Sequence, residues 1–171
     1  LFFDFFRDKG YVVLRPFADP EKKFDWVENR FAPGVNPTFD VLRRMTARVK
    51  QSLNIDDSRV YALGFSDGAD GAFGLDVYAP SDFAGFVCYN SMLTQLHADD
   101  IYLKNAINRP MYLVHSDKDE IRPVEQIRLI AGLLDSLSAP LLFKEYTGYE
   151  HYDRHLLKDL PHARRYLQGL S

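Results

Sequence analysis

Short apolar runs separated by helical patterns constrain this chain most. Four of five runs are nearly continuous, as in strands that helices bury on both faces of a parallel sheet. The runs are YVVLRPF (11–17), VYALGF (60–65), FAGFVCY (83–89), MYLVH (111–115) and LLFKEY (141–146). Helical spacing follows Pro37 and Pro123 and recurs near the end, where Pro161 marks a kink or restart. This alternation predicts a three-layer α/β/α sandwich with a mostly parallel sheet.

The composition predicts one compact domain over residues 1–171. Hydrophobic residues make up 46% of the chain, charged residues 26%, and the formal net charge is −3. The basic residues are scattered, so we expect no nucleic-acid partner. No apolar run is long enough to cross a bilayer, so we expect no membrane span. The single cysteine, Cys88, lies in an apolar run and is expected to be a small buried hydrophobe.

The first ten residues, LFFDFFRDKG, have the pattern of an apolar helix that ends at Gly10. The chain starts with Leu1 rather than with methionine. We therefore expect residues 1–171 to be the carboxyl-terminal part of a longer protein.

The segment GFSDG (64–68) is an instance of GxSxG that directly follows a predicted strand and precedes a helical stretch. A sharp strand-to-helix turn exposes the central hydroxyl and requires small flanking residues, which Gly64 and Gly68 provide. The turn also places Ser66 at a helix amino terminus, where developing negative charge is favoured. We predict Ser66 as a nucleophile and the N–H of Asp67 as an oxyanion-hole donor. An ordinary glycine–serine turn is the alternative.

A serine nucleophile requires a carboxylate and a histidine later in the chain, each at the end of a strand. The loop after the fourth apolar run offers the carboxylate. Asp119 lies four residues after His115 and four before Pro123, far enough along the loop to leave the strand end, and is predicted as the acid. Asp117 is the alternative, and Glu120 is expected to place negative charge near the following helix start.

The loop after the last apolar run offers the histidine. His151 lies nearer the strand end, and Gly148 gives this loop freedom to turn, so His151 is predicted as the general base. His155 falls within the last helical pattern and is interpreted as a surface or capping residue. The stretch HADD (97–100) matches no known metal-ligand spacing, so we expect a solvated loop there and no metal or cofactor.

These segments together resemble the α/β-hydrolase superfamily, in particular the esterase branch with polyhydroxybutyrate depolymerases, feruloyl esterases and dienelactone-hydrolase-like proteins. The resemblance is carried by DDSRVYALGFSDGADGAF, SDFAGFVCYNS, HSDKDEIRPVEQ and TGYEHYD. It covers the chain from about residue 11 to the end and implies a Ser66–His151–Asp119 triad. Ser116 and Ala69 replace glycines that are usual in the family; both are small, so neither harms the fold. Asp67 beside the nucleophile is also unusual, and we interpret its carboxylate as hydrated rather than as a binder of a cationic substrate group.

The resemblance also implies that the sheet lacks its amino-terminal strands. In this fold a strand between the runs at 11–17 and 60–65 ends in a loop that supplies the second oxyanion donor, and the sequence has no such strand. Loss of one donor costs on the order of a hundredfold in turnover, so residues 1–171 alone are expected to be a poor enzyme.

The predicted function is hydrolysis of a small-molecule carboxylic ester through an acyl-enzyme. Four aromatic residues are predicted near the cleft to suit an acyl or aromatic group, with ordinary packing as the alternative. They are Phe65, Trp26, Tyr89 and Tyr149. The alternatives are a serine peptidase of the same fold and an inactive hydrolase-like binding module. A Rossmann or flavodoxin-like nucleotide binder is disfavoured, because no glycine-rich loop follows the first run.

Overall fold

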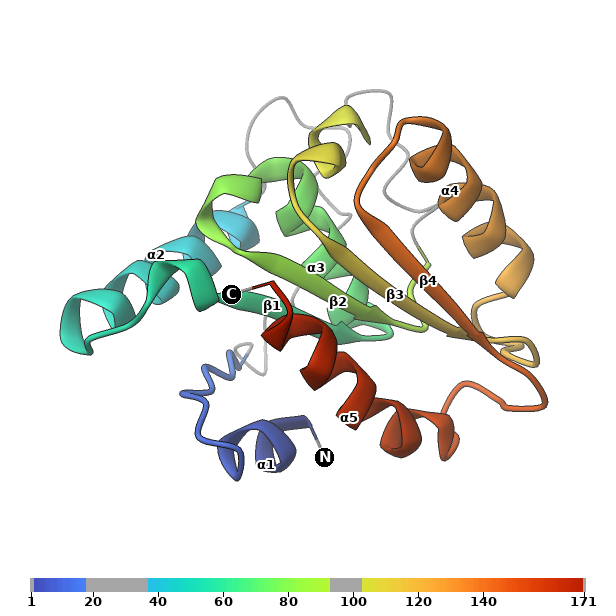
Figure 1. Ribbon diagram of the computed structural model, residues 1–171, viewed down its shortest axis with the longest axis horizontal. Coiled ribbons are helices and arrows are strands. Elements are labelled where there is room, and N and C mark those ends of the chain that lie inside the picture. The colour runs from blue at the N-terminus through green and yellow to red at the C-terminus, as the bar shows by residue number, and fades with distance from the viewer. Residues whose placement is uncertain (1, 18–36, 93–102, 171) are drawn as a thin grey trace.

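The computed structural model describes residues 2–17, 37–92 and 103–170 (Figure 1). Within these ranges four strands alternate with helices, and they lie at four of the five apolar runs. The elements are α1 (Phe2–Arg7), α2 (Pro37–Ser52), β1 (Tyr61–Phe65), α3 (Asp67–Tyr78), β2 (Gly85–Tyr89), β3 (Met111–Ser116), α4 (Val124–Ser136), β4 (Leu141–Tyr146) and α5 (His155–Gln168). Three short 3-10 helices cover Asp57–Arg59, Pro80–Asp82 and Leu103–Asn108.

The strands form one parallel sheet in the order β1-β2-β3-β4. Every residue of β2 and β3 is buried, whereas the outer strands β1 and β4 are mostly half-buried. The central runs are apolar without alternation because helices cover both of their faces. The carboxyl ends of all four strands meet at one rim, which is where the loops with Ser66, Asp119 and His151 begin.

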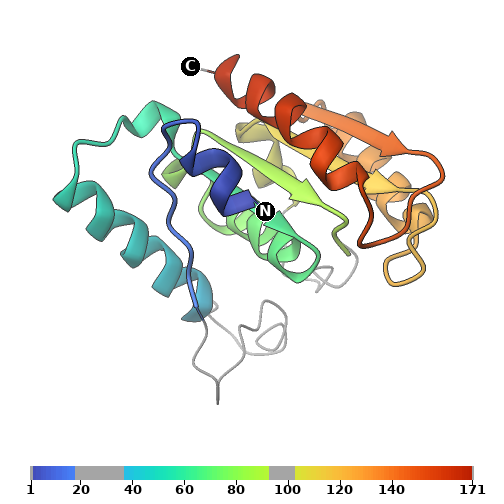
Figure 2. The same cartoon turned by 90° about the horizontal axis from the view of Figure 1, so that it is seen from below.

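Two separate apolar clusters make the molecule three-layered. On one face α3 and α4 pack against the sheet, with Phe73, Phe86 and Ile127 fully or almost fully buried. On the other face α5 and α1 cover β2 and β3, around Val114 and Leu160. Figure 2 shows α1 and α5 together on the near side of the sheet. This is the predicted α/β/α sandwich. The helix α5 continues through Pro161 without the restart that the proline indicated.

The run at 11–17, predicted as a strand, forms no strand in the structure. Exposure alternates only over its first four residues: Tyr11 and Val13 pack against the α5-side cluster, and Val12 and Leu14 are exposed. A strand needs a backbone partner, and β1 pairs only with β2 among the described residues. The apolar content of this run therefore did not determine whether a strand lies beside it.

No helix among the described residues has both the length and the apolar character required to span a bilayer. Cys88 is fully buried in β2, and burial raises the pKa of its thiol, in keeping with the predicted small hydrophobe.

Candidate active site

Ser66 is the single residue between the end of β1 and the start of α3. Its backbone angles, φ 55° and ψ −121°, lie in a region that a residue with a side chain rarely adopts, at a cost on the order of 1–3 kcal/mol. The N–H of Ser66 donates to the Tyr89 carbonyl at 2.8 Å, which fixes the turn to β2. A sharp strand-to-helix turn at the predicted nucleophile is therefore present.

The two glycines of GFSDG differ in how strictly they are required. A Cβ atom at Gly64 would lie 1.9 Å from the Gly68 carbonyl oxygen, so no larger residue fits there without a backbone shift. A Cβ atom at Gly68 meets no described atom within 4 Å. The close approach of the strand to the first turn of α3 therefore requires a glycine at position 64 only.

The structure brings Ser66, His151 and Asp119 together at the rim of the sheet. His151 Nε2 lies 2.9 Å from Ser66 Oγ, and His151 Nδ1 lies 2.6 Å from Asp119 Oδ2. An ionised carboxylate only accepts hydrogen bonds, so Nδ1 carries the proton and Nε2 is left to accept the hydroxyl proton. His151 and Asp119 are buried, at 3% and 4% exposure.

The carboxylate of Asp119 is surrounded by donors. The backbone N–H groups of Ile121 and Arg122 donate to Oδ1 at 3.0 and 2.8 Å, and the Asn90 amide donates to Oδ2 at 2.8 Å. Burial acts to raise the pKa of Asp119, but the hydrogen bonds from His151, Arg122 and Asn90 outweigh it and hold this pKa below its ordinary value. Asp119 therefore stays ionised at neutral pH.

The alternative acids have other surroundings. Asp117 accepts the Gly148 N–H at 2.6 Å, which ties the acid loop to the histidine loop. Glu120 is exposed. His115 lies 3.6 Å from Asp119, but its Nε2 contacts the Arg122 carbonyl at 2.7 Å, and burial lowers its pKa. His115 is therefore neutral and forms no ion pair with the acid.

A buried ion pair, which the sequence reasoning missed, joins α3 to the acid loop. Arg122 Nη1 lies 2.5 Å from Asp70 Oδ2, and Ser91 Oγ and the Met92 N–H donate to Asp70 Oδ1 at 2.6 and 2.8 Å. Asp70 lies one helical turn after Ser66. The signal available in the sequence was an acidic residue within an apolar helical stretch, because a buried carboxylate needs a partner.

The predicted aromatic residues divide between two places. Phe65 packs beside His151, with ring centroids 5.0 Å apart. Tyr152, which the sequence reasoning missed, lies edge-on to His151 at 4.6 Å and is 73% exposed. The ring of Tyr149 packs instead against Tyr146 and His155.

Tyr89 does not line a substrate site as predicted. Its side chain is fully buried under α5, and its hydroxyl donates to Asp159 at 2.9 Å. The side chain follows the alternation of β2 and points into the helix-covered layer. Trp26 and the stretch at 97–100 lie outside the described residues.

His155 is also placed differently from the prediction. It begins α5, but it is fully buried rather than a surface residue, because its ring lies between the histidine loop and the end of β2. In the part of the chain that the structure describes, no group of three His, Cys, Asp or Glu side chains could hold a metal ion.

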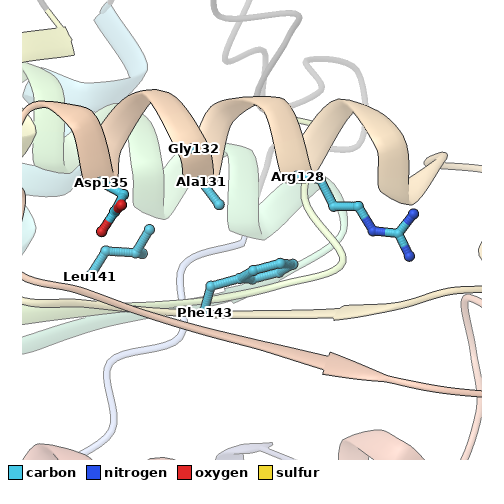
Figure 3. A pocket seen from close by; sticks show the side chains of 6 residues that line it. All are labelled: Arg128, Ala131, Gly132, Asp135, Leu141 and Phe143. Carbon is cyan, nitrogen blue, oxygen red and sulfur yellow. The ribbon is translucent and has the colours of Figure 1, made fainter.

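A hollow between α4 and β4 lies apart from these residues (Figure 3). Its lining residues on the sheet, Leu141 and Phe143, lie in the first half of β4, whereas Ser66 follows the carboxyl end of β1. The lining residues are Arg128, Ala131, Gly132, Asp135, Leu141 and Phe143.

Comparison with known proteins gives structural likenesses only, since neither a protein-family model nor a curated protein sequence matches the chain. An uncharacterized protein from Bacillus cereus is similar with a TM-score of 0.76 at 19% identity, over 98% of this chain and 54% of that one. Esterase PE8 is similar with a TM-score of 0.64 at 16% identity, over 90% of this chain and 68% of that one. An acylaminoacyl peptidase is similar with a TM-score of 0.64 at 18% identity, over 77% of this chain and 27% of that one.

At such identities these likenesses establish the fold but not the activity, which has to be inferred from the chemistry of the site. The chain spans only part of each of these proteins. With its parallel sheet between two helical layers, the chain has the α/β-hydrolase fold.

Proposed function

We propose that the protein is a serine hydrolase that cleaves carboxylic esters through an acyl-enzyme. The observation that supports this most strongly is the hydrogen-bonded line from Ser66 through His151 to Asp119, three side chains from three distant loops. A hydroxyl, an imidazole and a carboxylate in this order form the arrangement that activates a serine.

In the first half of the reaction, Ser66 Oγ attacks the ester carbonyl while His151 Nε2 takes the hydroxyl proton. Asp119 stabilises the imidazolium that forms. Collapse of the tetrahedral intermediate expels the alcohol, to which His151 returns the proton. In the second half, water attacks the acyl-enzyme by the same route and releases the acid.

The developing oxyanion needs donors at the start of α3. Asp67 is the first residue of this helix, so its N–H lies in the turn where the helix dipole is positive, and we assign it as one donor. Phe65 and Tyr152 beside His151 would contact the acyl or alcohol group.

A fluorophosphonate probe tests the nucleophile in the full-length protein. We expect covalent labelling that disappears in Ser66→Ala and persists in Ser91→Ala, a buried serine outside the triad. Absence of labelling in a folded full-length protein would favour the inactive binding module instead.

The substrate class needs a separate assay, because a peptidase shares the fold. We expect hydrolysis of p-nitrophenyl acetate without hydrolysis of aminoacyl p-nitroanilides. The opposite preference would assign the peptidase.

A further inference from the structure

Asn90 occupies a central position that the proposed triad leaves unexplained. It directly follows β2, which lies between β1 and β3, the strands that lead to Ser66 and Asp119. The residue is fully buried, and its φ of 48° is a left-handed conformation that asparagine tolerates better than most residues. Its N–H donates to the Val114 carbonyl at 2.9 Å, which holds this bend against β3.

The side-chain amide of Asn90 uses both of its hydrogens on the acid loop. Nδ2 lies 2.8 Å from Asp119 Oδ2 and 2.7 Å from Ser116 Oγ. Oδ2 is also the oxygen that accepts His151 Nδ1–H. The amide therefore holds the same carboxylate oxygen that orients the imidazole.

His155 determines which way this amide faces. Its Nε2 lies 3.0 Å from Asn90 Oδ1, and burial lowers the pKa of His155, which keeps the ring neutral. An amide oxygen only accepts, so Nε2 carries the proton of the neutral ring. Tyr146 and Tyr149 pack on the ring at 5.8 and 5.6 Å and restrict its rotation. With Oδ1 so engaged, Nδ2 is fixed toward Asp119.

We propose that Asn90 and His155 are positioning residues that hold Asp119 in register with His151, a role that rests on the proposed hydrolase function. The hydrogen-bonded line thus continues beyond the acid, from Asp119 to Asn90 and on to His155 at the start of α5. Neither residue touches the reacting atoms; both act through the carboxylate. Loss of the amide leaves Oδ2 with the imidazole as its remaining side-chain donor, and the carboxylate is then held only by this imidazole and by the two backbone N–H groups on Oδ1.

Asn90→Gly removes the amide and keeps the left-handed backbone accessible. We expect kcat on p-nitrophenyl acetate to fall about tenfold to a hundredfold with KM nearly unchanged, because a small misplacement of a catalytic group has effects of this order. The acid limb of the pH–kcat profile should move to higher pH, because Asp119 loses a donor that favours its ionised form. His115 and His155, the other titratable side chains that interact electrostatically with Asp119 besides His151, are unchanged in this variant.

His155 offers a conservative pair of variants. His155→Phe keeps a ring without a donor and should lower kcat about threefold to tenfold, a smaller effect because it acts one step further away. His155→Gln supplies an amide donor and should restore most of the loss. Asn105→Gly is the matched control. It removes a 2.8 Å bond from an asparagine amide to the Val77 carbonyl, remote from the acid loop, and should leave the pH profile unchanged.

A spectroscopic readout separates this inference from the proposed function. The parent should show a downfield proton resonance for His151 Nδ1–H, which shifts or broadens in Asn90→Gly and not in Asn105→Gly, whether or not the protein hydrolyses esters. The positioning role is wrong if fluorophosphonate labels the parent protein and Asn90→Gly keeps the parental kcat, pH profile and resonance. In that case the hydrolase assignment stands. A parent that neither labels nor hydrolyses overturns the hydrolase assignment, and the resonance alone then decides the positioning contact. Urea unfolding of each variant shows whether it is folded, so that the kcat, pH profile and resonance of folded proteins are compared.

Discussion

The buried carboxylates Asp119 and Asp159 each accept hydrogen bonds from several donors, but the kinds of donor differ. Asp159 on α5 is fully buried and accepts hydrogen bonds from the hydroxyls of Tyr89, Tyr112 and Tyr146 and from Lys144, at 2.8 to 2.9 Å. Burial and the adjacent carboxylate raise the pKa of Tyr89 and of Tyr112, so both phenols remain protonated donors. The four donors to this carboxylate are all side chains of strands β2, β3 and β4.

Asp119 also has donors on both of its oxygens, but one of them is an imidazole whose other nitrogen faces the half-buried hydroxyl of Ser66. Burial and donor number therefore do not distinguish a carboxylate in the proposed triad from a structural one. The two carboxylates differ in their donors: Asp119 contacts an imidazole that lies beside the proposed nucleophile, whereas Asp159 contacts three phenols and an ammonium group. Substitutions in the two regions should therefore affect different quantities.

The largest effect is expected at Asp119. Asp119→Asn should lower kcat about 10⁴-fold, because an amide no longer stabilises the imidazolium and favours the wrong tautomer. The free energy of unfolding should change far less than the activity. Steady-state kinetics with urea unfolding checks both, and a greater loss of kcat in Asp117→Asn would transfer the acid role to Asp117.

At Asp159 the effect should fall on stability instead. Asp159→Leu leaves the Lys144 ammonium and three phenols without their common acceptor, and we expect the free energy of unfolding to fall by about 3–5 kcal/mol. The kcat per folded molecule should stay within about threefold of the parent, because no triad atom contacts Asp159. A loss of kcat without a loss of stability would contradict the assignment of Asp159 as a structural carboxylate.

Asp76 is a third case, a buried carboxyl that accepts no hydrogen bond from the described residues. Burial raises its pKa to about 8, against a partial opposing effect of Arg109. A carboxyl with a pKa raised in the folded state contributes full stability below its unfolded pKa, and that contribution is lost as pH rises toward the folded pKa. Between about pH 4 and pH 8 the loss amounts to about 1.4 kcal/mol per pH unit.

The variant Asp76→Asn removes this titration. The difference in free energy of unfolding between parent and variant, measured by urea titration at pH 5, 6 and 7, should therefore change steadily in favour of the variant. A difference that does not vary with pH would show that Asp76 is ionised in the folded protein.

The smallest effect is expected at Tyr152, on the exposed side of the proposed triad. Tyr152→Ala should raise KM for phenyl acetate about twofold to tenfold, because an edge contact between aromatic rings contributes about 0.5–1.5 kcal/mol. Methyl acetate provides the matched substrate without a ring, and its KM should not change. An equal change for both esters would indicate that Tyr152 supports His151 rather than the substrate.

Much of the fold followed from local patterns. The runs at 60–65, 83–89, 111–115 and 141–146 became strands, because nearly continuous apolar residues can be buried on both faces only inside a covered parallel sheet. The run at 11–17 did not, since pairing requires a neighbouring strand that hydrophobicity does not specify. Similarly, Tyr89 was predicted near a substrate and lies under α5, because the side of a strand to which a residue points depends on register.

Local residue patterns were enough to predict the strands in chain order and the residues that follow each of them. These patterns thereby predicted Ser66, Asp119 and His151 at one rim of a parallel sheet, because parallel strands end on the same side. The buried polar groups that contact these residues became apparent only from the folded arrangement. Asn90, His155, Asp70 and Arg122 come from four different segments, and the hydrogen bonds from Arg122 to Asp70 and from His155 to Asn90 span 52 and 65 positions of sequence. Hydrogen bonds between such segments depend on distance and direction in space, for which residue spacing carries no signal.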